Sequence, residues 1–252
     1  MREIAPGANA RVRGNTAALV QVALFALGAV VLTAMSIAAH SLPYFPVDVT
    51  ISQGVQTYHP GWLNAATAAL SWTGFPPQSD VLFGMIVVSL VVLGHRWVAA
   101  VEAAAAIGSG GLYLLLEQVV GQPRPSADLV QVAGPIQMSG FPSGHLATFV
   151  AVFGFFAFLG YRGLRPSTMR WLPVGLVGVL VLLMSFARIY AGQHWASDVL
   201  AGCLLGGLWL AAIIRLYTWG KARFSRRRPT AGPAPRRKTL ALATGVELTR
   251  HS

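Results

Sequence analysis

Long uncharged stretches alternate with short polar segments along most of the chain. The first stretch, Ala17–Ala39, is 23 residues long, enough for a helix that crosses a bilayer. The other stretches that read as spans are Pro77–His95, Trp97–Val120, Phe141–Tyr161, Trp171–Ala187 and Ala196–Trp219. This pattern predicts an all-α protein, a polytopic membrane helix bundle with about six transmembrane helices.

The first apolar stretch has a competing interpretation as a cleaved signal peptide. The apolar core of a signal peptide has about 7–15 residues, and this one is longer, which favours a retained helix. Residues 62–75 are too short to span and are expected to lie at the interface or to be partly re-entrant. We therefore expect an N-terminal tail at 1–16, a membrane domain at 17–219 and a disordered tail at 220–252.

Composition agrees with a membrane protein and places most of the charge outside the apolar stretches. Only 11% of the 252 residues are charged, against about 25% in soluble domains. Nine of the nineteen Lys and Arg residues follow position 220. This basic tail is typical of a segment close to anionic membrane lipids, not of a nucleic-acid-binding domain. Cys203 stands alone, and no Cys or His spacing predicts a metal or another cofactor.

The positions of the basic residues predict an orientation. With the N-terminus inside, seventeen of the nineteen Lys and Arg residues fall on the cytoplasmic side of the six predicted spans. Both termini are then cytoplasmic in a multi-pass protein of the cell membrane. The two exceptions are Arg124 and Arg188, which this topology places at the outer face.

Three polar clusters arrive at that same outer face. The first is Gly121-Gln122-Pro123-Arg124-Pro125, after the third predicted span. The second is Phe141-Pro142-Ser143-Gly144-His145, where the fourth span begins. The third extends from Arg188 through His194 to Asp198. We therefore expect one site, built from three distant parts of the chain.

The residue types in these clusters suit phosphoryl transfer. Arg124 and Arg188 can grip phosphate oxygens through paired N–H donors, and the helix start at Ser143-Gly144 offers further donors. His194 and Asp198 are four residues apart, so they share a helix face, and the carboxylate would hold the ring as a nucleophile. His145 is free to protonate a leaving oxygen. The hypothesis is a phosphohistidine mechanism that requires no metal.

Together the clusters resemble the signature of the type 2 phosphatidic acid phosphatase family, over roughly residues 78–218. The resemblance implies a six-helix membrane fold and removal of phosphate from a lipid phosphate or diphosphate. It implies that His194 is the nucleophile, Asp198 its partner and His145 the acid. The residues that would hold the phosphate are Arg124, Ser143, Gly144 and Arg188. Substrates compatible with it include a polyprenyl diphosphate, phosphatidate and phosphatidylglycerophosphate.

The chain departs from the family pattern at two positions. Glu117 stands where the family usually has Lys, and Ala187 stands where it usually has Ser. Glu117 is expected either to pair with Arg124 or to contact a cationic part of the substrate, and Pro125 is a second candidate contact. Two alternatives to hydrolysis stay open. One is a lipid-linked phosphotransferase with the same site, and the other is a non-catalytic lipid-binding or transport protein.

Overall fold

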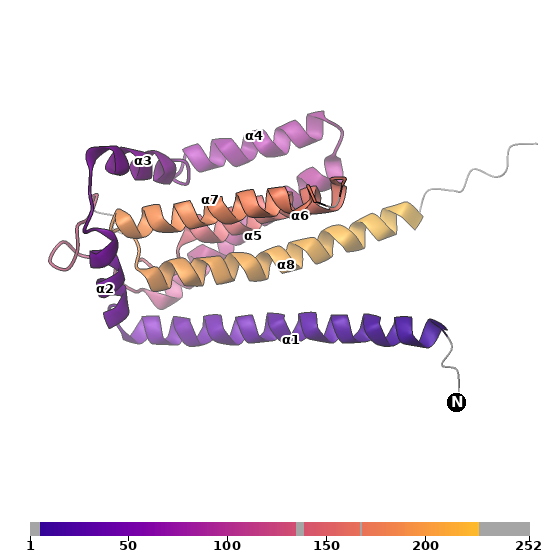
Figure 1. The fold of residues 1–252 in the computed structure, drawn as a ribbon, viewed down its shortest axis with the longest axis horizontal. Helices are drawn as coiled ribbons and strands as arrows, with labels where there is room; N and C mark the ends of the chain where they lie inside the picture. Colours follow the sequence, from indigo (N-terminus) through magenta and orange to yellow (C-terminus); the bar gives the residue numbers. More distant parts are fainter. Residues whose placement is uncertain (1–5, 135–138, 167, 227–252) are drawn as a thin grey trace, which may run out of the picture.

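The computed structural model describes residues 6–134, 139–166 and 168–226, and within these ranges the regular structure is entirely helical. The helices are α1 (Pro6–Ser41), α2 (Pro46–Val55), α3 (Gly61–Trp72), α4 (Gln78–Val92), α5 (Arg96–Val120), α6 (Gly144–Gly163), α7 (Trp171–Tyr190) and α8 (Ala196–Arg226). Figure 1 shows the long helices side by side in an up-and-down bundle, with α2 and α3 at one end. The predicted all-α membrane bundle is confirmed.

Five of these helices are long and apolar enough to cross a membrane, and α4 is a shorter sixth. The five candidate spans are Ala18–Ser41, Arg96–Val120, Gly144–Gly163, Trp171–Tyr190 and Ala196–Arg223. Helix α4 has 15 residues, about 22 Å at 1.5 Å per residue, against a hydrocarbon core of about 30 Å. Two prolines precede it, and Gly94 follows it with φ 81°, a conformation that favours glycine. The structure thus agrees with about six apolar helices.

The first and last helices are longer than the apolar stretches that predicted them. Helix α1 begins at Pro6 and α8 continues to Arg226, so residues 6–16 and 220–226, which belong to the two predicted tails, are helical. Once a helix has formed, each further residue adds a hydrogen bond at little cost, and Ala, Arg and Lys are good helix formers. Residues 1–5 and 227–252 of the two predicted tails lie outside the described residues.

The short apolar segment at 62–75 forms α3, which packs against α7. Figure 1 places α3 at the same end of the bundle as α2. The turn after α3 lies beside the start of α6, because a Cβ atom on Gly74 would collide with the ring of His145. A segment that is too short to span therefore contributes to the end of the bundle where the polar clusters meet.

Helix α6 is the centre of the bundle and contacts α5, α7 and α8. The residues that fill these contacts have no exposed surface: Leu146, Ala147, Ala151, Val152 and Phe155. Three of the five are Ala or Val, so the neighbouring helices approach closely. Small residues are typical of helix interfaces in membranes, where packing has to supply most of the attraction.

The contact between α6 and α8 depends on two glycines of α8. A Cβ atom on Gly202 would collide with the carbonyl oxygen of Ser143, and one on Gly206 would lie 2.5 Å from the carbonyl oxygen of Ala147. The two glycines are four residues apart and so face the same side of α8. Their close approach fixes the start of α6, with Ser143, against the first turns of α8.

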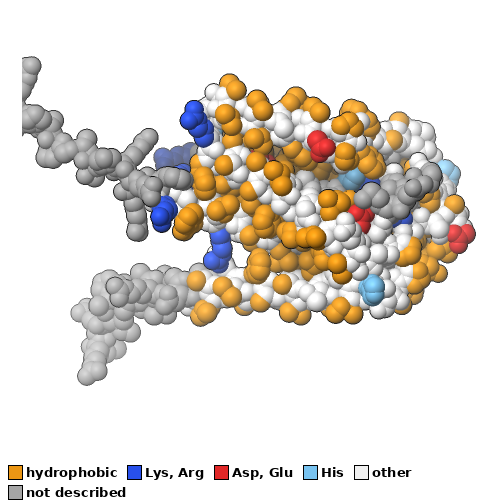
Figure 2. Space-filling view, turned by 180° about the vertical axis from the view of Figure 1, so that it is seen from behind, with side chains coloured by type: hydrophobic (Ala, Val, Ile, Leu, Met, Phe, Trp, Pro, Cys, Tyr) orange, Lys and Arg blue, Asp and Glu red, His pale blue; other side chains and the backbone are white. Residues whose placement is uncertain are grey.

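The basic side chains are concentrated at the other end of the bundle. Figure 2 shows most of the Lys and Arg side chains at the end of the bundle where α1 begins and α8 ends. They include Arg162, Arg165 and Arg170 around the α6–α7 connection. The other end carries α2, α3 and the first turns of α6 and α8 (Figure 1). The two ends of the molecule therefore differ in charge as the sequence predicted.

Two adjacent glycines of α8 provide a test of this packing. Gly206→Ala places a methyl group against the backbone of α6, and we expect it to lower the stability by about 1–3 kcal/mol. Gly207→Ala is the matched control, because its Cβ atom would have nothing within 4 Å; it should leave the stability unchanged or raise it by up to about 1 kcal/mol. Thermal unfolding in detergent measures both variants. Equal stability of the two would contradict the close α6–α8 contact.

Candidate active site

Three distant segments meet at the end of the bundle that carries α2 and α3. The Arg124 guanidinium donates through Nη1 to the Gln193 carbonyl oxygen at 2.7 Å and to His194 Nε2 at 3.1 Å. The backbone N–H of Ser143 donates to the carbonyl oxygen of Asp198 at 2.9 Å. The structure therefore brings together the segment after α5, the start of α6 and the α7–α8 connection.

The ring of His194 is buried, and its hydrogen bonds specify its tautomer. A guanidinium group has only donors, so Nε2 must accept from Arg124. The proton is then on Nδ1, which donates to the Gly140 carbonyl oxygen at 2.9 Å. Burial holds the pKa of His194 well below its usual value, and the charges of Arg188 and Arg124 lower it further. The ring is thus neutral near pH 7, with its Nε2 lone pair directed at an arginine.

Asp198 lies beside His194, but it is not the nearest acceptor for the ring. Its Oδ2 is 3.5 Å from His194 Nδ1 and accepts from the backbone N–H of Trp195 at 2.8 Å. The spacing of four residues correctly predicted the proximity, while the shorter contact to Nδ1 comes from the Gly140 carbonyl. Gly140 was missed because every residue carries a carbonyl group. The position does favour glycine, because a Cβ atom on residue 140 would lie only 2.9 Å from Asp198 Oδ2.

Arg188 is a buried cation with unused donors. Only 1% of its surface is exposed, and its Nε and Nη1 atoms have no hydrogen-bond partner. Its guanidinium lies over the ring of Phe75 at 4.8 Å from the ring centre. Buried polar groups are nearly always hydrogen-bonded, so these donors indicate a ligand that accepts hydrogen bonds. An anion with several oxygens, such as phosphate, fits this requirement.

The second arginine, Arg124, is half-buried in the loop after α5. Burial lowers the pKa of Arg124, whereas the nearby Asp198, Glu117 and Tyr113 act in the opposite direction. Pro125 follows it and is buried, and its ring restricts the backbone at this point. Arg124 therefore combines a hydrogen bond to the ring of His194 with attraction to nearby acidic groups.

Ser143 and Gly144 form the start of α6. Ser143 is the N-cap residue, fully buried, and its hydroxyl has no hydrogen-bond partner. Gly144 is the first helical residue, and a Cβ atom there would lie 2.9 Å from the ring of Tyr113. The first N–H groups of a helix have no partner within it, and they carry a partial positive charge. This end of α6 can therefore contribute donors to the anion that Arg188 requires.

His145 faces the turn after α3. Its Nε2 is 3.3 Å from the carbonyl oxygen of Ser71, and a carbonyl only accepts, so Nε2 carries the proton. The rings of Phe75 and His145 pack edge to face, with their centres 4.7 Å apart. Ser71, Gly74 and Phe75 could not be predicted as part of the site, because a backbone oxygen, a glycine and an apolar ring have no chemical signature in a sequence. The structure places all three around His145.

Glu117 lies on the last turn of α5 and is buried, with 5% of its surface exposed. The Tyr113 hydroxyl donates a hydrogen bond to it, and Arg124 is close enough to interact with its charge. Its Oε1 atom has no hydrogen-bond partner. Of the two expectations, the structure agrees with an electrostatic pairing to Arg124. The unpartnered oxygen also leaves a contact with substrate open.

A second set of contacts from α2 holds the loops of the site. Asp48 accepts from the Ser197 backbone N–H at 2.9 Å and from its hydroxyl at 2.6 Å. Gln56 donates to the carbonyl oxygens of Gln131 at 2.8 Å and Tyr190 at 2.9 Å. These contacts tie the start of α8 and the end of α7 to one short helix. Among the described residues, no three His, Cys, Asp or Glu side chains cluster in a way that could hold a metal ion.

Comparison with known proteins shows which family the chain resembles. Residues 96–222 match the PAP2 superfamily. The chain is 30% identical over 120 residues to a lipid A 1-phosphatase of Rhizobium etli. This alignment covers 44% of this chain and 47% of the relative, so the chain matches about half of that protein's length. It is 25% identical over 202 residues to a lipid A 4'-phosphatase of Bacteroides thetaiotaomicron, which covers 75% of this chain and 85% of the relative.

The fold also matches a solved structure. The crystal structure of a transmembrane PAP2-type phosphatidylglycerolphosphate phosphatase from Bacillus subtilis superposes with a TM-score of 0.63. The alignment covers 80% of this chain and 98% of that one, at 19% identity, which shows a common fold. The matched segment 96–222 contains every residue that the sequence proposed for the site. The resemblance seen in the three polar clusters is thus confirmed, and the chain belongs to the PAP2 superfamily.

Proposed function

We propose that the protein is a membrane lipid phosphatase, which hydrolyses a phosphate ester or anhydride of a lipid through a phosphohistidine on His194. The observation that carries the proposal is a neutral, buried imidazole whose Nε2 lies 3.1 Å from an arginine. Beside it, Arg188 is a buried guanidinium with unused donors. A phosphoryl group bound to these donors would present its phosphorus to Nε2. The named relatives, which are phosphatases of lipids, support the same class of reaction.

The first half of the reaction forms the phosphohistidine. Phosphate oxygens replace His194 Nε2 as the partner of Arg124 and satisfy the unused donors of Arg188. Nε2 attacks phosphorus, and the bond from phosphorus to the leaving oxygen breaks. When the substrate binds, His145 takes up a second proton from solvent at its other ring nitrogen. It then passes its Nε2 proton to the leaving oxygen and becomes neutral, so the lipid leaves as an alcohol or a phosphomonoester. The Nδ1 proton of His194 stays in place, held by the Gly140 carbonyl and by the charge of Asp198.

The second half returns the enzyme to its initial state. Water attacks phosphorus, and the P–N bond breaks. His145, which is now unprotonated at Nε2, takes the proton of that water, and inorganic phosphate is released. The arginines and the start of α6 stabilise the charge that develops on the equatorial oxygens in both steps. No step uses a metal ion.

The substrate is a lipid phosphate whose headgroup reaches the end of the bundle next to α2 and α3. Candidates are a polyprenyl diphosphate, phosphatidate and phosphatidylglycerophosphate, as the motifs alone suggested. The concentration of Lys and Arg at the opposite end (Figure 2) supports an orientation with both termini in the cytoplasm. The site would then lie at the outer face of the cell membrane.

Removal of the nucleophile provides the direct test. His194→Ala should lower phosphate release from every lipid phosphate tested by about a thousandfold or more, because no other group can form the covalent intermediate. His59→Ala is a matched control, since His59 belongs to the connection between α2 and α3, where its Nδ1 contacts the Gln56 carbonyl oxygen, and to none of the three clusters. Colorimetric phosphate release measures both variants. Unchanged release by His194→Ala would reject the nucleophile assignment.

The low pKa of His194 predicts a pH dependence of stability. An unfolded histidine takes up a proton below about pH 6.5, whereas burial and two arginines keep the folded ring neutral there. The unfolded state therefore binds more protons, and stability falls as pH drops through this range. Wild-type protein should lose more thermal stability between pH 7.5 and 5 than His194→Asn. Equal losses would show that the folded ring titrates normally.

The charge of Glu117 should weaken phosphate binding at Arg124. Glu117→Gln removes this charge, and we expect the inhibition constant of inorganic phosphate to fall by about three- to tenfold. Gln118→Lys makes the same change in net charge on an exposed position of the same turn and should have little effect. Steady-state kinetics over several lipid phosphates also show whether substrate preference shifts. Identical kinetics in both variants would leave Glu117 with a structural role only.

A further inference from the structure

The turn between α3 and α4 contacts two residues of the candidate active site, although it belongs to none of the three clusters. It comprises residues 73–77 and lies outside the segment 96–222 that matches the superfamily. The Phe75 side chain in this turn packs against both Arg188 and His145. One apolar residue therefore touches the buried cation and the proposed acid at the same time.

The contact between Phe75 and Arg188 holds a cation without using its hydrogen-bond donors. The guanidinium carbon of Arg188 lies over the ring, 4.8 Å from its centre. The face of an aromatic ring attracts a cation, and more strongly when that cation is out of water, as Arg188 is. Nε and Nη1 of Arg188 keep no hydrogen-bond partner in this arrangement. A carboxylate in the place of the ring would instead bind the N–H groups that a phosphate needs.

The contact between Phe75 and His145 restricts the plane of the imidazole. The two rings have their centres 4.7 Å apart and their planes at 81°, which is a favourable geometry for an aromatic pair. The hydrogen bond from His145 Nε2 to the Ser71 carbonyl oxygen is long, at 3.3 Å, against about 2.7–3.2 Å for a typical N–H···O bond. Gly74 limits the ring from the same turn, because a Cβ atom there would collide with it. The turn therefore holds His145 by packing as well as by a hydrogen bond.

The turn is itself fixed to the helix that carries Arg188. The backbone N–H of Phe75 donates to the Trp72 carbonyl oxygen at 3.2 Å, which ties the turn to the end of α3. The Tyr190 hydroxyl donates to Asn64 Oδ1 at 2.6 Å, which joins α3 to the end of α7. Arg188 lies in the last turn of α7. The ring and the cation that it contacts are thus held in one connected unit.

We propose that Phe75 is a positioning residue for the reaction, whose ring fixes the Arg188 guanidinium and the His145 imidazole relative to each other. The inference rests on the proposed function, in which Arg188 holds phosphate oxygens and His145 protonates the leaving oxygen. Both side chains must then be aligned on one phosphoryl group, and a displacement of about 1 Å can lower a rate by about a hundredfold. Phe75 takes no part in bond making and acts through these two side chains.

Substitution of the ring tests the proposal on the full-length protein in detergent micelles. Phe75→Leu keeps an apolar side chain in the turn, and we expect kcat for phosphate release from phosphatidate to fall by about tenfold or more. The inhibition constant of inorganic phosphate should rise by about threefold or more, because Arg188 loses the contact that holds it. Phe75→Tyr keeps the ring and should retain at least about half of the wild-type kcat.

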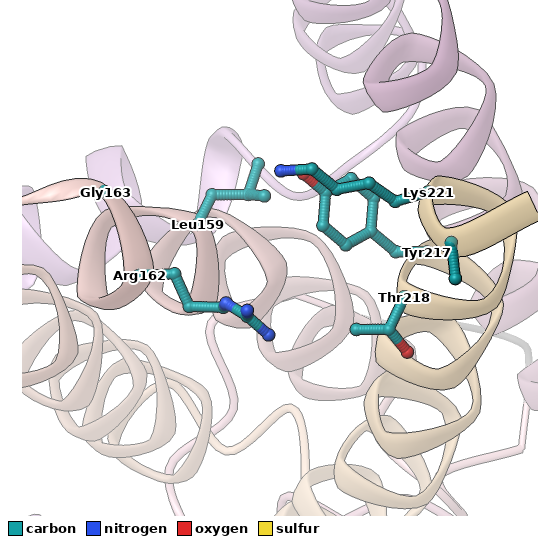
Figure 3. Close-up of a pocket in the computed structure, with 7 residues that line it drawn as sticks. Leu159, Arg162, Gly163, Tyr217, Thr218 and Lys221 are labelled. Carbon is teal, nitrogen blue, oxygen red and sulfur yellow. The ribbon is translucent and has the colours of Figure 1, made fainter. Parts of the chain in front are cut away.

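Phe158→Leu is the matched control for the loss of a ring. The Arg162 guanidinium lies over the Phe158 ring at 5.7 Å, and the Tyr217 ring meets Phe158 at 85° with the centres 6.0 Å apart. Arg162 and Tyr217 line a cavity of about 420 Å³ between α6 and α8, at the other end of the bundle (Figure 3). Phe158→Leu should lower thermal stability as Phe75→Leu does, but it should keep kcat and the phosphate inhibition constant within about twofold of wild type.

A second substrate separates the effect on His145 from the effect on Arg188. The leaving group of p-nitrophenyl phosphate departs as a stable anion and has little need of a proton from an acid. The loss of kcat/KM in Phe75→Leu should therefore be at least about threefold smaller with this substrate than with phosphatidate. The remaining loss reports the displacement of Arg188.

Four results would overturn the proposal. Equal kinetics of Phe75→Leu and Phe158→Leu would show that the ring at 75 has no special part in the reaction. A Phe75→Tyr variant as slow as Phe75→Leu would show that the ring is not the feature required. An unchanged phosphate inhibition constant in Phe75→Leu would exclude an action through Arg188, and equal losses on the two substrates would exclude one through His145.

These results differ from a failure of the proposed function. That failure would appear in the wild-type protein, as an absence of any phosphate release that depends on His194. Failure of the inference about Phe75 appears only in the variants, while the wild-type protein stays active.

Discussion

The candidate active site depends on the burial of a positive charge whose hydrogen-bond donors are left open. Arg188 is 1% exposed and has two unpaired donor atoms. Taking an ion out of water costs several kcal/mol unless a partner replaces the water. The fold accepts this cost and keeps the donors fixed, so in our proposal an entering phosphate meets hydrogen-bond donors that are already in place. The same charges keep His194 neutral and thus able to act as a nucleophile.

Fixed donors are useful only if the backbone around them is rigid, and the structure provides this rigidity twice. Within the bundle, Gly202 and Gly206 let α8 approach α6 so closely that an added methyl group would meet backbone atoms. At the end of the bundle, Asp48 and Gln56 of α2 tie down the start of α8 and the end of α7. Buried polar contacts of this kind specify one arrangement, because leaving any of them unmade is expensive.

The α6–α8 pair also connects the two ends of the molecule. Its first turns carry Ser143, His145 and Asp198, and its last turns carry the basic residues Arg162 and Lys221. The two ends of the pair therefore differ in chemistry, because buried polar groups gather at one end and exposed basic side chains at the other.

The amino-acid sequence was enough to predict about six apolar helices, the difference in charge between the two ends and the residues of the three clusters. These follow from local properties: the length of an apolar stretch, the position of Arg and Lys, and the helical spacing of His194 and Asp198. The family resemblance rested on the same residues. It also identified Glu117 as an unusual residue before the structure showed it buried beside Tyr113.

The groups that complete the site could be identified only after the chain had been followed through its fold. The Gly140 carbonyl is closer to His194 Nδ1 than Asp198 is, and the turn with Ser71 and Phe75 surrounds His145. A carbonyl group or an apolar ring looks the same in every sequence, and these contacts join positions more than fifty residues apart. Their geometry depends on how closely the helices pack, which is a property of all the side chains at the interfaces together.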